Sequence, residues 1–63
     1  MIDAITRAQF DSLNCRYLRR LECSAGGALS ATVVDQYVTA DDRVVIHTYA
    51  MGGEDFVILD SWP

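Results

Sequence analysis

Residues 43–62, RVVIHTYAMGGEDFVILDSW, decide the fold of this chain. Two runs rich in β-branched and aromatic residues, 43–51 and 55–62, flank Gly52-Gly53. A two-residue type I′ turn needs positive φ at both central positions, and glycine adopts positive φ without a Cβ clash. The stretch therefore predicts an antiparallel β-hairpin in which Met51 faces Glu54.

This register sorts the hairpin side chains onto two faces, because successive residues of a strand point to opposite sides. It pairs Tyr49 with Phe56, His47 with Ile58, Val45 with Asp60 and Arg43 with Trp62, on a face of mixed aromatic and polar character. The opposite face is aliphatic and contains Val44, Ile46, Val57 and Leu59. Both faces are largely apolar, so both need cover.

Length and composition indicate one small soluble domain. A chain of 63 residues buries only about 60% of its unfolded surface, and 51% apolar with 22% charged residues excludes a disordered tail. No apolar run reaches the roughly 20 residues that cross a bilayer, and residues 1–8 lack the order of a secretion signal, so we expect a cytoplasmic protein. Cys15 and Cys23 lack the spacing of a zinc site and are expected to be free thiols.

The charge pattern favours binding over catalysis. Nine acidic residues against five arginines give a net charge of −4, which favours a partner with a basic surface. Two carboxylate pairs, Asp41-Asp42 and Glu54-Asp55, fall at opposite ends of the central strand, roughly 25–30 Å apart, too far for joint acid/base work or one metal ion. His47 has no nucleophile beside it in sequence, so we expect no enzyme, cofactor or metal.

The N-terminal segment predicts a helix. Thr6-Arg7-Ala8-Gln9 has the spacing of a capping box, and Ile5 and Phe10 are placed for a hydrophobic staple. A helical stripe of Phe10, Leu13, Tyr17, Leu18 and Leu21 extends the predicted helix from about Arg7 to Ser24, with Gly26-Gly27 as its stop. In an alternative interpretation the helix ends near Asn14, and Cys15 to Ser24 form a further strand.

Residues 29–39 predict the remaining strand, since Thr32-Val33-Val34 and Tyr37-Val38-Thr39 are rich in β-branched residues. A two-residue turn at Asp41-Asp42 would pair Val34 with Tyr49, Gln36 with His47 and Tyr37 with Ile46. A change of one residue in that loop would exchange the faces of the strand. The predicted fold is α+β, an N-terminal helix packed on a three-stranded antiparallel β-meander, or in the alternative a short helix with a four-stranded antiparallel sheet.

A single helix covers only one face of such a sheet. We expect the helix to pack on the aliphatic face, to which Val33 is also assigned. The aromatic face is then left exposed as a partner-binding surface. The predicted site comprises this face and the acidic ends, namely Arg43, His47, Tyr49, Met51, Phe56, Ile58 and Trp62 with Asp41, Asp42, Glu54 and Asp55.

The predicted function is that of a small acidic protein-binding module that occupies a surface of a larger partner. Small acidic inhibitors made by phages, such as anti-CRISPR proteins, share this size and charge as a class, and such a protein would act in the host cytoplasm. A second hypothesis is a homodimer formed through the sheet. A third is nucleic-acid binding through Arg16, Arg19 and Arg20, which would form an arginine-rich helix face.

Overall fold

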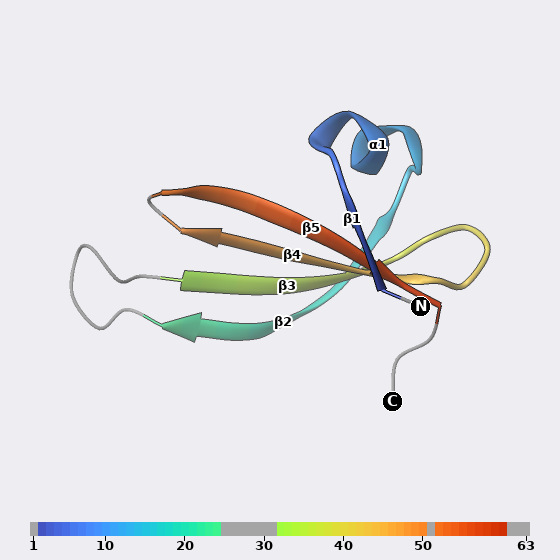
Figure 1. Ribbon diagram of the computed structural model, residues 1–63. Coiled ribbons are helices and arrows are strands. Elements are labelled where there is room, and N and C mark those ends of the chain that lie inside the picture. Colours follow the sequence, from blue (N-terminus) through green and yellow to red (C-terminus); the bar gives the residue numbers. More distant parts are fainter. Residues whose placement is uncertain (1, 25–31, 51, 61–63) are drawn as a thin grey trace.

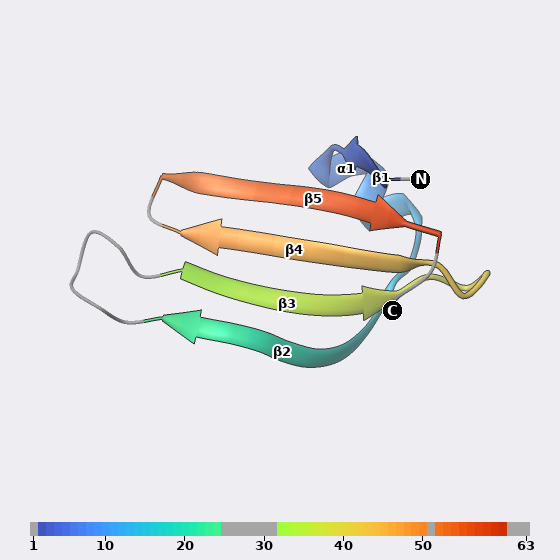
Figure 2. The same cartoon turned by 60° about the horizontal axis from the view of Figure 1, so that its bottom comes forward.

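The computed structural model describes residues 2–24, 32–50 and 52–60, which form one antiparallel sheet and one short helix (Figure 1). The elements in chain order are β1 (Ile2–Ile5), α1 (Arg7–Ser12), β2 (Arg16–Ser24), β3 (Thr32–Val38), β4 (Val44–Ala50) and β5 (Gly53–Leu59). The five strands lie in the order β1-β5-β4-β3-β2, so β1 and β2 are the two edges of the sheet. Figure 2 shows β5, β4, β3 and β2 side by side. The α+β class is confirmed, and β3, β4 and β5 form the predicted antiparallel meander. The sheet has five strands rather than the predicted three, or four in the alternative, because β2 and β1 extend it at its two edges.

The start of the helix was predicted correctly and its end was not. The Thr6 hydroxyl accepts a hydrogen bond from the Gln9 amide at 3.1 Å, and the Gln9 side chain accepts one from the Thr6 amide at 2.8 Å, which completes the capping box. α1 ends after six residues, and Asn14 follows at φ 52°. Asparagine tolerates this left-handed conformation, which stops a helix. The helix to Ser24 is therefore wrong, and the alternative strand over 15–24 is confirmed as β2, while Gly26-Gly27 lies outside the described residues.

Two irregularities in β2 explain why it resembles a helix in sequence. Its pairing with β3 shifts between Tyr17 and Arg19 and again between Arg20 and Glu22, so that Leu18 and Leu21 are extra residues relative to β3. Each β-bulge breaks the alternation of a strand by one position. Apolar residues that recur every three or four positions then imitate the period of a helix.

β1 was not predicted from the sequence. Its four residues pair antiparallel with the outer edge of β5, from Ile2 opposite Leu59 to Ile5 opposite Phe56. A segment this short carries too few side chains to show a period. It nevertheless places the start of α1 beside β5.

The β4–β5 hairpin is confirmed, with a shifted register. Ala50 pairs with Gly53, so the connection begins one residue earlier than predicted, and His47 faces Phe56 while Val45 faces Ile58. Gly53 has φ 139°, a conformation that favours glycine. The partners differ from the predicted ones by two residues, which leaves every side chain on its predicted face. Met51 and Trp62 lie outside the described residues.

The β3–β4 pairing differs from the predicted one by a single residue, which exchanges the faces of β3. The Thr39 amide donates to the Arg43 carbonyl at 2.8 Å, so the connection holds three residues rather than two, with Asp42 in the left-handed region at φ 65°. The predicted pairs of β3 with β4 are therefore wrong. The observed pairs are Val33 with Tyr49, Asp35 with His47, and Tyr37 with Val45.

The helix packs on the aromatic face of the sheet, contrary to our expectation. We call the side of the sheet that faces α1 the inner face and the opposite side the outer face. The buried core on the inner face consists of Val45, Phe56 and Ile58, against which Ile5, Phe10, Leu13, Cys15 and Tyr37 pack. Phe10 of α1 stacks on Phe56 at 4.5 Å between ring centroids and meets Tyr37 edge-on at 4.9 Å. Ring-to-ring contacts of this kind stabilise beyond the area they bury, which favours the aromatic face as the seat of the helix.

Candidate protein interface

The middle of the predicted binding face is buried. Val45 is 0%, Phe56 3%, Ile58 8% and His47 8% exposed, so these side chains have almost no surface to offer a partner. Tyr49 is half-buried, and its hydroxyl donates to Asp35 at 3.1 Å. The prediction that this face stands exposed is therefore wrong, because Phe10 of α1, together with Ile5, Leu13 and Cys15, packs on Val45, Phe56 and Ile58.

His47 belongs to a group of contacts that connects the first residue of α1 to the β4–β5 hairpin. Its ring lies parallel to Phe56 at 4.2 Å, and its Nε2 is 2.9 Å from a Glu54 carboxylate oxygen rather than bonded to Gln36 as its predicted pairing implied. Arg7 donates to the same carboxylate at 2.9 Å and lies over the Phe56 ring at 5.7 Å. The hydrogen bond with His47 and the nearby Arg7 charge hold the pKa of Glu54 below its ordinary value. These contacts are those of a structural histidine.

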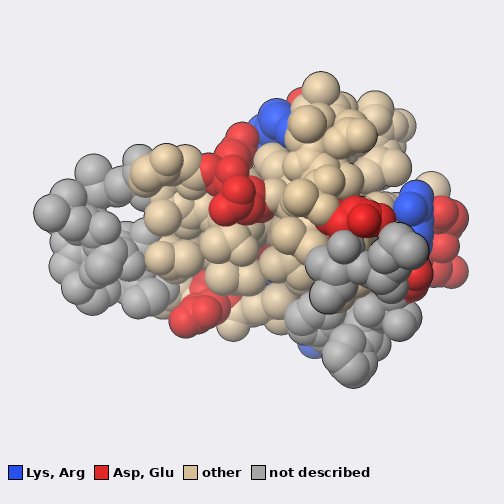
Figure 3. Space-filling model, viewed as in Figure 1, with Lys and Arg blue, Asp and Glu red and all other residues tan. Residues whose placement is uncertain are grey.

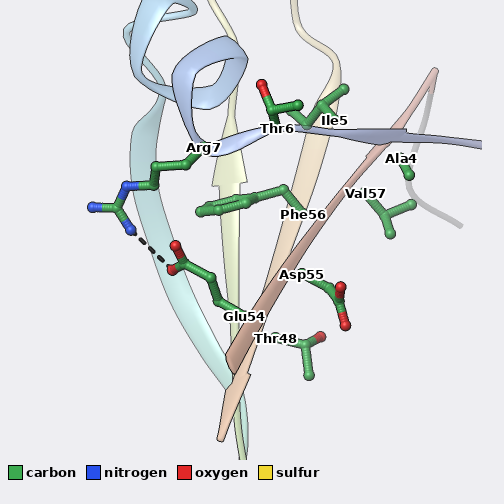
Figure 4. Close-up of a pocket in the computed structure, with 9 residues that line it drawn as sticks. All are labelled: Ala4, Ile5, Thr6, Arg7, Thr48, Glu54, Asp55, Phe56 and Val57. Atoms are coloured by element: carbon green, nitrogen blue, oxygen red, sulfur yellow. Dashed lines mark hydrogen bonds and ion pairs between the residues drawn. The ribbon is translucent and has the colours of Figure 1, made fainter. Parts of the chain in front are cut away.

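A depression of about 520 Å³ opens where β1 separates from β5 after Ile5 (Figure 4). Its polar walls include Arg7 and Glu54, which are bonded to each other, and Phe56 fills part of the space between them. Among the described residues no group of three histidine, cysteine, aspartate or glutamate side chains is placed to hold a metal ion. Arg7 and Glu54 are therefore already paired with each other, and the exposed Asp55 is the remaining charged residue of the lining.

The acidic pairs lie at opposite ends of β4, as predicted, and one carboxylate of each pair, Asp41 or Glu54, is engaged by other side chains. Asp41 accepts hydrogen bonds from the Thr39 hydroxyl and from Arg43 Nε, the latter at 3.0 Å, and these bonds lower its pKa. Arg43 is thus held within its own turn, and its predicted contact with Trp62 lies outside the described residues. Asp42 and Asp55 are exposed. On the side shown in Figure 3, carboxylates form separate groups rather than one acidic patch.

An ionic contact between a half-exposed arginine and a buried carboxylate, not predicted from the sequence, anchors the edge strand. Asp35 is 3% exposed, and Arg20 Nε lies 3.0 Å from one of its carboxylate oxygens while the Tyr49 hydroxyl donates to the other. Arg20 also reaches the Tyr49 oxygen at 3.4 Å. Because the exchanged face of β3 points Asp35 inward, this network joins β2, β3 and β4.

The exposed large hydrophobic side chains among the described residues all lie on β2. Tyr17 is 50%, Leu18 42% and Leu21 38% exposed. Within the described ranges β2 pairs with β3 alone, so its other side is a free sheet edge. We call this surface the β2 edge and define it by Tyr17, Leu18, Leu21, Arg16 and Arg19. The strand alternative for residues 15–24 is the one sequence signal that pointed to it.

The three arginines of this segment do not form the predicted helix face. Arg20 lies on the inner face with Asp35, whereas Arg16 and Arg19 lie on the outer face, opposite Val38 and Gln36. Arg19 Nε donates to the Gln36 side chain at 2.8 Å. The strand therefore divides the basic cluster between two sides of the sheet.

No family model matches the sequence, and neither a curated protein nor a solved structure matches the chain. No helix within residues 2–24, 32–50 and 52–60 is long and apolar enough to cross a membrane. Cys15 and Cys23 are free thiols.

Proposed function

We propose that this protein is a small protein-binding module that acts by occupying a partner's surface through the β2 edge, and not by catalysis. One observation carries the proposal: Tyr17, Leu18 and Leu21 are exposed on a free sheet edge, while Phe56 of the inner face is buried and Tyr37 and Tyr49 are half-buried. Exposed apolar side chains that adjoin one another usually mark an interaction site. An inhibitor that blocks host machinery, of the kind phages make, would use such a surface.

The chemistry of β2 supports side-chain contacts rather than strand addition. Natural sheets block unwanted pairing at an edge with bulges and charged residues, and β2 has two bulges and three arginines. Edge protection alone would place polar residues at the bulges, yet both bulged residues are leucines. We infer that the bulges turn these leucines toward a partner.

The test is co-purification of a stoichiometric complex from a lysate of the source cell or its host. We expect the Leu18→Gln/Leu21→Gln double variant to lose the complex and the wild type to keep it. Ala4→Gln, an exposed substitution on the opposite edge, is the matched control and should retain the partner. Recovery of the protein alone, or a complex that survives the double substitution, would contradict the proposal.

Self-association is a second candidate, favoured by the outer face of the sheet. Val34, Val38, Ile46, Val57 and Leu59 are half-buried there, and α1 lies on the other side. Two copies that stack these faces would form a sandwich. Light scattering decides between the two candidates, since a mass near 7.0 kDa at micromolar concentration would exclude the dimer.

A further inference from the structure

We infer that the β2 edge recognises an acidic segment of its protein partner, in which carboxylates flank apolar residues. This inference rests on the proposed function and adds the chemistry of the partner. The observation behind it is a pair of arginines, Arg16 and Arg19, which no carboxylate of the described residues neutralises and which adjoin the exposed leucines in sequence.

The other arginines are all paired with carboxylates. Arg7 contacts Glu54 and Asp11, Arg20 contacts Asp35, and Arg43 contacts Asp41, at distances from 2.9 to 3.6 Å.

Arg16 and Arg19 are different. Arg19 bonds to the neutral amide of Gln36, and no carboxylate of the described residues pairs with Arg16. The chain as a whole is acidic, with a net charge of −4, so two uncompensated guanidinium groups on one strand are a local exception. A charge left free at an interface favours an opposite charge on the partner.

The spacing of the two arginines suits carboxylates on a neighbouring segment. They lie opposite Val38 and Gln36, two residues apart on β3, which places their Cα positions about 7 Å apart along the sheet. Carboxylates two residues apart on an extended segment have this spacing, and those four apart on a helix come close to it, at about 6 Å. Arg19 uses only its Nε with Gln36, so both terminal nitrogens remain for a carboxylate.

Glu22 limits the basic surface. It lies opposite Val34 on the same outer face and is exposed. An acidic partner therefore meets attraction at Arg16 and Arg19 and repulsion at Glu22, which favours a position of its carboxylates at the Arg16 end of the strand. Glu22 and the exposed leucines also argue against a nucleic-acid backbone as the ligand. Glu22 repels phosphate groups, and leucine side chains make no favourable contact with them.

Selection from a display library of short random peptides on the immobilised protein tests the inference. We expect the selected pool to be enriched in aspartate and glutamate next to apolar residues. Binding of the best peptide, measured by fluorescence anisotropy, should weaken about tenfold in the Arg16→Gln/Arg19→Gln variant and should also weaken when NaCl rises from about 0.1 M to about 1 M. Glu22→Gln, the matched control with the opposite charge change, should bind more tightly.

The outcomes separate the inference from the proposed function. Peptides that need Leu18 and Leu21 but are neutral or basic, or that ignore the arginine substitutions, would overturn the inference and leave the module standing. If no selected peptide depends on the two leucines, both the acidic-partner inference and the proposed function are contradicted. Preferential binding of oligothymidylate that is lost with Arg16→Gln/Arg19→Gln would assign the arginines to nucleic acid, and a dimer that hides Leu18 would assign the edge to a second copy. Either result would overturn the acidic partner.

Discussion

Strands β4 and β2 belong to one sheet but differ in what surrounds them. β4 lies in the middle, with Val44, Val45 and His47 buried, whereas every side chain of β2 from Arg16 to Cys23 is exposed. The core consists of residues from β4 and β5, with residues of β1, α1, β3 and the segment after α1 packed against it, and no described side chain of β2 belongs to it. The difference indicates that β4 and β5 maintain the fold, while β2 is free to carry a binding surface.

The largest effect should come from the core beneath the helix. Phe56→Ala removes a ring that stacks on both Phe10 and His47, and such truncations cost about 3–5 kcal/mol. A domain of this size has about 3–9 kcal/mol of stability in total, so we expect a largely unfolded protein in urea titration. Phe56→Leu is the milder control. A loss below about 1 kcal/mol would mean that the centre of the sheet does not hold the fold.

A medium effect is expected where β2 is tied to the centre. Asp35→Asn keeps the shape but removes the charge that holds Arg20, and we expect a loss of about 1–3 kcal/mol by chemical denaturation. Arg20→Gln should destabilise less when Asp35 is already Asn, because the two substitutions break the same contact. Strict additivity in this double-mutant cycle would show that the pair does not anchor the edge strand.

The helix cap should contribute less. Thr6→Ala removes the hydroxyl that accepts the Gln9 amide and is expected to cost about 1 kcal/mol, read as a shift of the denaturation midpoint. Thr6→Ser keeps the hydroxyl and serves as the control. If the alanine and serine variants were equally stable, the cap would have no part in seating α1 on the inner face.

A smaller effect should appear in acid. The pKa values of Glu54 and Asp41 are lowered in the folded protein, so the stability they give is present above their unfolded values, near 4, and is lost as the pH falls through the folded values. We therefore expect thermal stability to decline below about pH 4. Glu54→Gln should weaken this decline, since it removes the carboxylate that joins His47 and Arg7. An unchanged pH profile in this variant would place the acid sensitivity elsewhere.

The smallest effect on stability should be at the β2 edge. Leu18→Gln/Leu21→Gln changes side chains that are 42% and 38% exposed, and we expect a change within about 0.5 kcal/mol at each position. A larger loss would show that these leucines are part of the core. This result would remove the contrast between β4 and β2 on which the proposed interface depends.

Local signals in the sequence were sufficient for some elements. The capping box at Thr6 and Gln9 and the hairpin between β4 and β5 depend on residues close together in the chain, and both were predicted. The register of that hairpin differed by two residues without changing a face, whereas a single extra residue in the 40–42 loop turned Asp35 inward and Gln36 outward. Whether a loop holds an odd or an even number of residues decides which face each side chain of the next strand occupies. Amino-acid composition does not reveal that number.

The sequence by itself determined the α+β class, the helix start and which side chains of β4 and β5 share a face, because these follow from caps, turns and the two-residue period of a strand. Only the tertiary structure decided that α1 covers the aromatic face and that residues 16–24 form an edge strand. The stacking of Phe10 on Phe56 and the pairing of Arg20 with Asp35 join residues distant in sequence. Such contacts override local periodicity, and they leave Tyr17 and the bulged leucines of β2 as the exposed large hydrophobic side chains of the described residues.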